Sequence, residues 1–333
     1  MGLLRRNLTR AEFYEPGKGI WRFRGLLPAF SREISLGEGN TPMIEAPALA
    51  ASAGCGRLFI KNEAMNPTGS FKARGMAAAV SRLLDLGAAT GVIPSAGNAG
   101  LALAAYGAAA GLAARIYIPS VTPEGVEEEC LAYGADVRTI EGILPDAAGA
   151  MAEDGLAEGE FAISTFREPG RVEGKKTMAF EIEGDFDGRS PGWVIFPTGG
   201  GTGVVAIWKA YLELRELGWI RGEMPRIAAV QSEGCAPLVR AFEEGAETAS
   251  PWIDPVTIAS GIRVPSSRAD RQVLRALRET GGTAVAVSDE EILGAVRAMA
   301  RSAGIFPSPE GAATLAGLIR LVGTGRIDAR DTV

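Results

Sequence analysis

The sequence contains no histidine. This absence excludes mechanisms that depend on an imidazole, such as Ser-His-Asp triads, histidine-ligated zinc and histidine proton shuttles. The only cysteines are Cys55, Cys130 and Cys235, and no two of them form a CxxC pair. Neither a cysteine metal site nor a disulfide framework is indicated, so a reducing cytoplasm is the expected compartment. Any chemistry must depend on lysine, carboxylates, hydroxyls, the backbone or a cofactor.

Concentrated positive charge is also lacking. The 34 Lys and Arg residues are scattered and are outnumbered by 40 Asp and Glu residues, so the net charge is −6. A nucleic-acid partner is not expected, since binding to a phosphate backbone needs a clustered basic surface. The one long uncharged run, 92–114, contains a proline, an asparagine and many small residues, so we interpret it as a strand end, a loop and a buried helix rather than a membrane span. The first sixteen residues carry acidic side chains where a secretory signal would be apolar, and no such signal is predicted.

What the sequence does have is enough length and apolar content for a large core. Its 333 residues are 47% hydrophobic and 22% charged, which indicates a folded chain of one large or two interlocked domains. Short apolar runs alternate with longer helical patterns, and such strand–helix–strand units predict right-handed crossovers and parallel sheets. The predicted strands are 58–61, 91–95, 114–119, 135–141, 193–197, 226–232 and 283–288, and the predicted helices are 76–87, 101–112, 123–134, 204–217, 237–244 and 289–303.

A glycine-rich segment, PTGGGTG (197–203), stands between a predicted strand and a predicted helix. Glycine lets backbone amides approach a ligand closely, and amides at a helix start attract anions together with the helix dipole. The segment lacks the lysine of a nucleotide P-loop and the GxGxxG spacing of a dinucleotide site. It therefore favours a small phosphate-bearing cofactor, and the alternative is a tight turn that binds nothing.

Two more segments follow predicted strands. NPTGSFKARG (66–75) places Lys72 near a helix start beside Arg74, where a neighbouring cation and the helix dipole both disfavour protonation of an amine. Lys72 is thus a candidate Schiff-base nucleophile, although a solvated lysine in the first turn is the commoner occurrence. PSAGNAG (94–100) offers a serine, an asparagine and free amides to a carboxylate, or else is an ordinary helix cap.

The segments NPTGSFKARG, SAGNAG, PTGGGTG and PSPEGAATLAG, in this order, resemble those of the tryptophan synthase β-type pyridoxal-phosphate enzymes, known as fold type II. Within that superfamily the sequence is most similar to threonine synthases, to which GEGNTPM (37–43) and EPGRVEGKKT (168–177) also correspond. The resemblance implies an α/β fold of two interlocked three-layer domains with mostly parallel sheets. Residues 1–75 and 166–333 would form the large cofactor-binding domain, and residues 76–165 a small mobile domain inserted in it.

The resemblance also implies a role for each site residue. Lys72 would be the catalytic residue and would hold pyridoxal 5′-phosphate as a Schiff base, and Asn98 would hydrogen-bond the cofactor's ring hydroxyl. The cofactor phosphate would lie on Gly199, Gly200, Gly201, Thr202 and Gly203. The substrate carboxylate would lie in the loop formed by Ser95, Ala96, Gly97, Asn98 and Ala99. Arg171 would bind a substrate phosphate, to which a guanidinium is suited, and the alternative is a surface arginine paired with Glu168 or Glu173. No metal site is expected.

The sequence departs from the threonine synthase pattern in three places. Ala73 stands where the family usually has aspartate, and Glu168-Pro169-Gly170 stands where it usually has Asn-Pro before the arginine. Relatives continue beyond the position of Val333 into a strand and a Thr-Gly-rich turn, whose hydroxyl contacts the pyridine nitrogen. Either the chain is part of a longer protein or another group, such as Ser308, makes that contact. These departures leave the substrate open.

The reaction implied by the resemblance is that of a lyase that converts O-phospho-L-homoserine and water to L-threonine and phosphate. The main alternative is a serine/threonine dehydratase or another amino-acid ammonia-lyase, which would share Lys72, Asn98 and the glycine loop but would not need Arg171. A non-catalytic pyridoxal-phosphate-binding protein is a further alternative. The expected partner is a small phosphorylated amino acid, and neither nucleic acid nor membrane is expected. Fold type II enzymes are commonly homodimers, so the resemblance leaves a homodimer open, but the sequence itself fixes neither the oligomeric state nor any allosteric effector.

Overall fold

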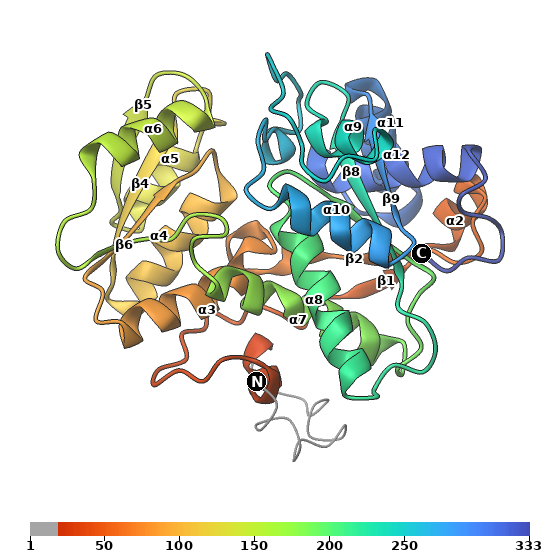
Figure 1. The fold of residues 1–333 in the computed structure, drawn as a ribbon, viewed down its shortest axis with the longest axis horizontal. Coiled ribbons are helices and arrows are strands. Elements are labelled where there is room, and N and C mark those ends of the chain that lie inside the picture. The colour runs from red at the N-terminus through yellow and green to blue at the C-terminus, as the bar shows by residue number, and fades with distance from the viewer. Residues whose placement is uncertain (1–18) are drawn as a thin grey trace. The chain divides into compact units, whose positions relative to one another are not determined.

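The computed structural model describes residues 19–333, which divide into two compact units (Figure 1). The first unit extends to Thr41 and then from Glu63 to Phe180, and the second comprises Pro42–Asn62 and Glu181–Val333. The predicted small domain, 76–165, lies within the first unit. The N-terminal segment for which no secretory signal is predicted lies outside the described residues.

A four-stranded parallel sheet of order β5-β4-β3-β6 forms the centre of the first unit. Its strands are β3 (Thr90–Pro94), β4 (Ala113–Pro119), β5 (Asp136–Ile140) and β6 (Glu160–Ala162), and its helices are α3 (Lys72–Asp85), α4 (Asn98–Ala110), α5 (Val126–Ala132) and α6 (Leu144–Asp154). Successive strand residues point to opposite faces. Ile93, Ile116 and Ile118 pack in one core cluster with α3 and α4, whereas Val92 and Tyr117 pack with α6. Helices cover both faces, as a parallel sheet requires.

The remaining elements of the first unit are short, apart from one long helix. They are the 3-10 turns η1 (Gly19–Leu26), η2 (Glu63–Met65) and η3 (Pro67–Gly69), and the helix α7 (Gly170–Asp185), whose last residues belong to the second unit. Turns η2 and η3 lead directly into α3, so the segment 63–72 is held at the start of that helix.

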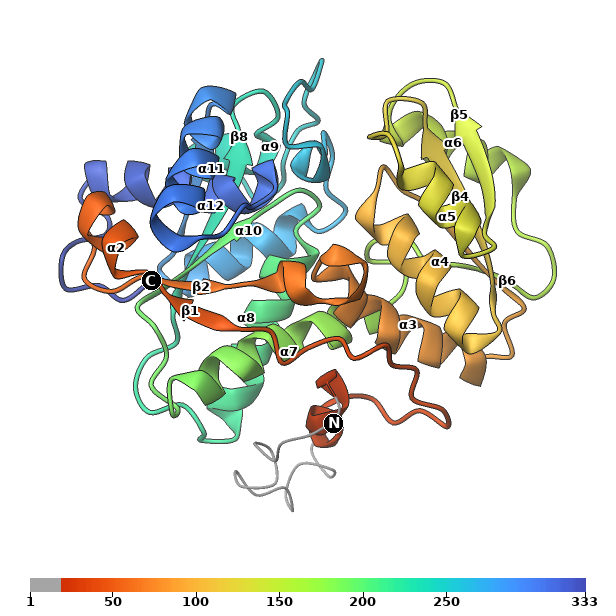
Figure 2. The same ribbon diagram turned by 180° about the vertical axis from the view of Figure 1, so that it is seen from behind.

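The second unit contains a three-stranded parallel sheet of order β7-β8-β9 and a separate antiparallel pair, β1-β2. The strands are β1 (Met43–Glu45), β2 (Phe59–Lys61), β7 (Trp193–Pro197), β8 (Arg226–Ser232) and β9 (Thr283–Val287). The other elements are α2 (Pro47–Ala53), α8 (Thr202–Glu216), α9 (Pro237–Glu243), η4 (Ser260–Ile262), α10 (Asp270–Glu279), α11 (Asp289–Ala303) and α12 (Pro309–Gly323). Seen from opposite sides, Figures 1 and 2 show α8 and α10 in front of the sheet in one view and α11 and α12 in front in the other.

The strands predicted from the sequence lie within one residue of the observed strands. The predicted helices are also present, although α3 and α4 begin three or four residues earlier than their apolar patterns suggest. The run 92–114 forms the end of β3, a loop, the buried helix α4 and the start of β4, as interpreted. The fold class is therefore confirmed. Helices α2, α6, α7, α10 and α12 and strands β1 and β6 were not predicted.

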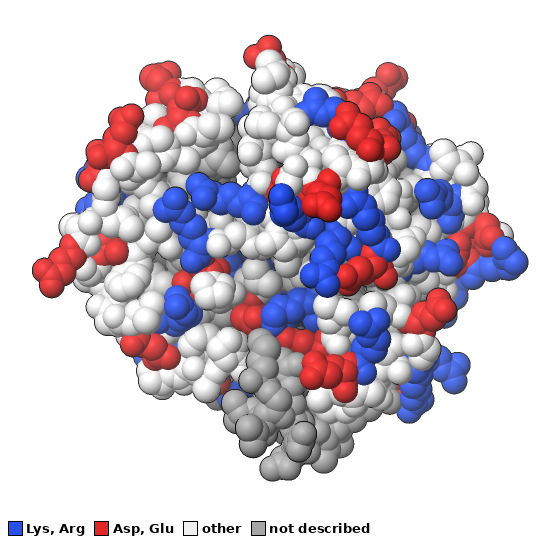
Figure 3. Space-filling view, viewed as in Figure 1, with Lys and Arg blue, Asp and Glu red and all other residues white. Residues whose placement is uncertain are grey.

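The surface carries charges of both signs. On the face shown in Figure 3, Lys and Arg side chains are interspersed with Asp and Glu side chains. Among residues 19–333, every helix is too short or too polar to cross a membrane. Within the same residues, no group of three or more cysteine, aspartate or glutamate side chains is arranged to hold a metal ion.

Candidate functional site

Lys72 is the first residue of α3. No side chain caps this helix start, so the first amides of α3 have no side-chain acceptor. The Lys72 amine lies 3.7 Å from the centre of the Phe71 ring, and the lysine side chain is half-buried. The preceding turn contains two buried hydroxyls, those of Thr68 and Ser70, that have no hydrogen-bond partner in the described part of the chain. The lysine therefore stands among polar groups that can accept a ligand.

Arg74 is held in a network of hydrogen bonds. Its guanidinium is fully buried and donates from Nε and Nη2 to the two carboxylate oxygens of Glu63, each at 2.7 Å. It also donates to the hydroxyls of Thr41 and Thr177, both at 3.1 Å. Asn66 adds a donor to the same carboxylate at 2.8 Å. The positive charge of Arg74 is thus matched by Glu63, and this network fixes the segment 63–74.

The loop of residues 95–99 is closed by one serine. The Ser95 hydroxyl accepts from the Gly100 amide at 2.8 Å and donates to the Gly97 carbonyl at 3.1 Å. Ser95 is therefore committed to the loop itself. Asn98 begins α4 without a side-chain cap, and its side chain is exposed. The backbone amides at this helix start, and the Asn98 side chain, are the groups that the loop offers to a ligand.

Arg171 is not a surface arginine. It is 3% exposed, and its guanidinium donates to the Ile163 carbonyl at 2.9 Å. Burial lowers the pKa of the Arg171 guanidinium to about 10, although the nearby Glu168 carboxylate opposes this effect. Glu168 itself accepts from Arg82 at 2.7 Å and from the Gly170 amide at 2.8 Å. The alternative of an exposed ion pair is wrong, and a buried guanidinium that still carries its proton at neutral pH is what a phosphate requires.

Helices α3 and α7 cross in close contact. A Cβ atom at Gly174 would overlap the carbonyl oxygen of Arg74, and one at Gly75 would lie 2.6 Å from the carbonyl oxygen of Arg171. Both positions therefore require glycine. The crossing brings Lys175 beside the start of α3, since the same Cβ at Gly75 would lie 3.2 Å from Lys175 Cε.

Lys175 is a residue that the sequence reasoning did not single out. It is 1% exposed, its amine lies 5.8 Å from the centre of the Phe71 ring, and that amine has no hydrogen-bond partner in the described residues. Burial, and then the charges of Arg171 and Lys72, lower the pKa of the Lys175 amine well below its usual value. The available signal was its spacing of four residues from Arg171, which places both on one face of a helix. That signal has meaning only once 170–185 is known to be helical.

The glycine loop belongs to the second unit. It connects β7 to α8, and its N-cap residue, Gly201, has a φ of +79°, a conformation that favours glycine. A Cβ atom there would also overlap the Val273 side chain. The Ser267 hydroxyl donates to the Gly200 carbonyl at 3.1 Å and so holds the loop. Because no side chain caps α8, its first amides are available to an anion, and phosphate binding by Gly199, Gly200, Gly201, Thr202 and Gly203 stays a prediction.

Ser308 is also in the second unit, and its hydroxyl already has a structural role. It is the N-cap of α12 and accepts from the Gly311 amide at 3.4 Å. Nearby, the carboxylate of Glu310 accepts from the Gly261 amide at 2.6 Å. A hydroxyl can accept one bond and donate another, so Ser308 stays a prediction for the contact with a ring nitrogen.

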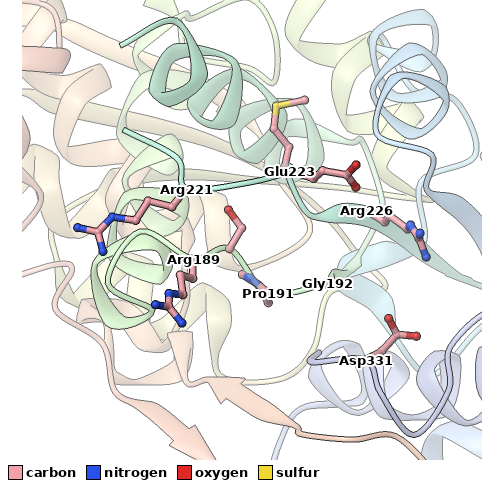
Figure 4. A pocket seen from close by; sticks show the side chains of 9 residues that line it. Arg189, Pro191, Gly192, Arg221, Glu223, Arg226 and Asp331 are labelled. Carbon is pink, nitrogen blue, oxygen red and sulfur yellow. The ribbon is translucent and has the colours of Figure 1, made fainter. Parts of the chain in front are cut away.

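A pocket of about 280 Å³ lies elsewhere in the second unit (Figure 4). Three arginines and two acidic residues lie around it, and Arg226 also lies over the Trp193 ring. Its lining consists of Arg189, Ser190, Pro191, Gly192, Arg221, Glu223, Met224, Arg226 and Asp331. None of the predicted site residues lines this pocket, so we assign it no part in the chemistry.

The residues present suit pyridoxal phosphate. A lysine amine is the group that bonds to an aldehyde, and in the turn before Lys72 the hydroxyls of Thr68 and Ser70 are buried without a hydrogen-bond partner in the described residues. The uncapped start of α8 provides amides for a phosphate, and the uncapped start of α4 provides them for a carboxylate. Taken separately, each unit thus contains groups that match one part of such a ligand. These features define an α/β protein of the class that binds an aldehyde-bearing, phosphorylated cofactor.

Comparison with known proteins identifies the family. Residues 34–333 match the family described as pyridoxal-phosphate dependent enzyme, and the chain belongs to it. It is 38% identical over 315 residues to a threonine synthase of Methanosarcina acetivorans, with 94% of this chain and 77% of that protein covered. It is 36% identical over 318 residues to a threonine synthase of Methanocaldococcus jannaschii, with 95% and 78% covered. The protein is a pyridoxal-phosphate-dependent enzyme, and its cofactor is pyridoxal 5′-phosphate.

Solved structures show the same fold. A fungal L-serine ammonia-lyase from Rhizomucor miehei aligns with a TM-score of 0.75 at 20% identity, over 88% of this chain and 91% of that one. Maize serine racemase aligns with a TM-score of 0.73 at 22% identity, over 84% and 80%. At these identities the likeness concerns the fold alone, and it confirms the fold type II architecture.

Proposed function

We propose that the protein is a lyase of the threonine synthase type, which converts O-phospho-L-homoserine and water to L-threonine and phosphate. One structural observation carries this proposal: a buried guanidinium, Arg171, lies in the same unit as Lys72. A dehydratase acting on serine or threonine would have no phosphate to place there. The curated relatives that share more than a third of the sequence are named threonine synthases, which supports the same reaction.

The chain's own residues have the following roles in the proposal. Lys72 binds the cofactor through Nζ, and the same nitrogen, once released, removes the proton from the substrate's α-carbon. Asn98 hydrogen-bonds the cofactor's ring hydroxyl. When bound, pyridoxal phosphate supplies the electron sink for the charge that develops at the α-carbon. The cofactor phosphate is held by the amides of Gly199, Gly200, Gly201, Thr202 and Gly203.

The substrate is held at both ends. Its carboxylate lies on the amides of the loop Ser95, Ala96, Gly97, Asn98 and Ala99, and closure of this loop excludes water from the reacting carbon. Arg171 holds the phosphate before and after the bond to the γ-carbon breaks. The released phosphate serves as the acid or base for the addition of water at the β-carbon, since the sequence has no histidine for that step.

The decisive experiment measures inorganic phosphate and threonine formed from O-phospho-L-homoserine by the cofactor-loaded protein. We expect stoichiometric release of both, and loss of both in Lys72→Ala together with the visible absorption of the bound cofactor. Keto-acid and ammonia formed from serine or threonine, without phosphate release from O-phospho-L-homoserine, would replace this proposal with an ammonia-lyase. A full cofactor spectrum without any turnover would indicate a non-catalytic binder.

The setting of the enzyme is also proposed. It acts in the cytoplasm on a small phosphorylated amino acid, without a nucleic-acid or membrane partner. It assembles as a homodimer, which light scattering tests, since a mass equal to that of one chain would contradict it.

Residues 76–165 move as a small domain within the larger cofactor-binding domain of 1–75 and 166–333.

A further inference from the structure

Helix α7 presents an unusual amine to the start of α3. Lys175 is almost fully buried, and its Nζ makes no hydrogen bond within the described residues. The next residue, Lys176, is equally buried but donates to Glu173 at 2.6 Å. Two neighbouring lysines with the same burial thus differ, within the described residues, because Lys176 has a carboxylate partner and Lys175 has none.

The carboxylates near Lys175 are committed elsewhere. Glu168 accepts from Arg82, Glu173 accepts from Lys176, and Glu63 accepts from Arg74. The charged groups that face Lys175 are Arg171 on its own helix and Lys72 on α3, and both are cations. The Phe71 ring also lies near the amine, with its centre at 5.8 Å. The surroundings of Lys175 therefore contain excess positive charge.

A buried amine without a partner lowers the stability of the fold, so its presence suggests that a ligand supplies the missing partner. The packing keeps the amine in this place, because α3 and α7 approach at Gly75 and Gly174 and the end of the Lys175 side chain lies against Gly75. A lysine and an arginine one helical turn apart can together pair with two negative charges and donate to several oxygens. The ligand that fits them is therefore a compact dianion with several oxygens, such as a phosphate ester.

We infer that Lys175 is a second cation of the substrate's phosphate subsite, where its amine hydrogen-bonds the phosphate oxygens beside the Arg171 guanidinium. This inference rests on the proposed function, since it needs a phosphorylated substrate. Burial, and then the charges of Arg171 and Lys72, lower the pKa of the free Lys175 amine, so a bound dianion that pairs with the amine raises this pKa and draws protons from solvent. A substrate without a phosphate leaves the amine unpaired, so Lys175 is a specificity-determining residue.

Sulfate is a suitable probe, because it is a dianion with no proton of its own to exchange in the range of the experiment. Calorimetric titration of sulfate into the holoenzyme at pH 8, in two buffers of different ionisation enthalpy and at constant ionic strength, gives both affinity and proton uptake. We expect net proton uptake with sulfate binding in the wild type. Lys175→Met and Lys175→Gln should lose this uptake and bind sulfate about 10- to 100-fold more weakly.

Lys176→Gln is the matched control, since it removes the adjacent buried amine. It should keep both the sulfate affinity and the proton uptake, while its melting temperature falls because Glu173 loses a partner. Lys175→Met should melt at a higher temperature than the wild type without sulfate, because an unpaired amine is replaced by an apolar chain of similar length. A lower melting temperature for Lys175→Met would mean that the amine has a structural partner and would overturn the inference.

Unchanged affinity and proton uptake in Lys175→Met would also overturn it, as would sulfate binding to the wild type without proton uptake. Turnover separates this failure from failure of the proposed function. An enzyme that releases phosphate and threonine with the same KM for O-phospho-L-homoserine in wild type and Lys175→Met is still a threonine synthase, but Lys175 is then not part of its phosphate subsite. A rise of about 10-fold or more in KM, with a smaller change in kcat, supports the inference.

Discussion

At the scale of the residue, two buried ionisable groups of the first unit differ in their hydrogen bonding. The Glu38 carboxylate is fully buried but accepts hydrogen bonds from the Tyr106 hydroxyl at 2.6 Å and from the Leu36 amide at 2.9 Å. The Lys175 amine is equally buried and accepts or donates none within the described residues. The Glu38 carboxylate has its hydrogen bonds made within the fold, whereas the Lys175 amine does not.

Glu38 gives a pH-dependent prediction. Burial raises the pKa of this carboxyl, and the hydrogen bond from Tyr106 opposes the rise. A carboxyl whose pKa is higher in the folded state than in the unfolded state loses stability as the pH rises between the two values. Tyr106→Phe removes a donor and raises the pKa of Glu38 further. The variant should therefore be destabilised by about 2 kcal/mol at pH 8 and by less at pH 4.5.

Urea unfolding of Tyr106→Phe at the two pH values measures this difference. Tyr133→Phe is the control, because Tyr133 is exposed and its hydroxyl makes no hydrogen bond among those described in residues 19–333. An equal loss of stability at both pH values in Tyr106→Phe would show that Glu38 does not respond to the hydroxyl.

At the scale of the element, the crossing of α3 and α7 leaves no space for a side chain at Gly174. Gly174→Ala would place a methyl group on the carbonyl oxygen of Arg74 and should lower the free energy of unfolding by more than about 3 kcal/mol. Gly149→Ala is the matched control in the exposed interior of α6, where a Cβ atom has open space. It should raise the free energy of unfolding by about 0.5–1 kcal/mol, because alanine is the better helix former.

Urea denaturation of the two variants gives both values. Equal stability of Gly174→Ala and wild type would mean that the two helices can separate without cost. Cofactor content of Gly174→Ala is a second readout, since displacement of α7 would shift the start of α3, where Lys72 lies.

Local sequence pattern predicts some elements of this fold and misses others, among them helix α7 of this crossing. Strands such as β4 and β8 are short apolar runs between polar turns, so local pattern identifies them. Helix α7 buries Arg171, Lys175 and Lys176, and these charged residues conceal its apolar face from a reading of hydrophobic period. The sequence could single out Lys72, the loop at 95–99 and the glycine loop because each lies between a strand and a helix, and their roles stay predictions. The sequence could not single out Lys175, because its importance comes from contact with a helix about a hundred residues earlier in the chain.

At the scale of the whole molecule, the proposed motion of residues 76–165 has a measurable signature. If these residues move as one body, amide hydrogen exchange should change on addition of threonine and phosphate to the holoenzyme mainly near residues 75 and 166 and in the loop 95–99. The interior of β4 should keep its protection, because its neighbours move with it. A uniform change throughout 63–180 would show instead that the first unit responds as a whole.

The interleaving of the two units has a consequence for the order in which they can form during synthesis. All residues of the first unit precede Glu181, so its sheet and the helices on both faces can assemble while the remainder of the chain is still being made. The segment Pro42–Asn62 is made early but packs with residues that follow Glu181, among them Trp193 and the helices α11 and α12. During translation the apolar surface of α2 and of the β1-β2 pair therefore stays exposed until the helices α11 and α12, in the last third of the chain, have left the ribosome. The other segments find their partners in the order of synthesis, so Pro42–Asn62 is the segment that a chaperone would need to protect.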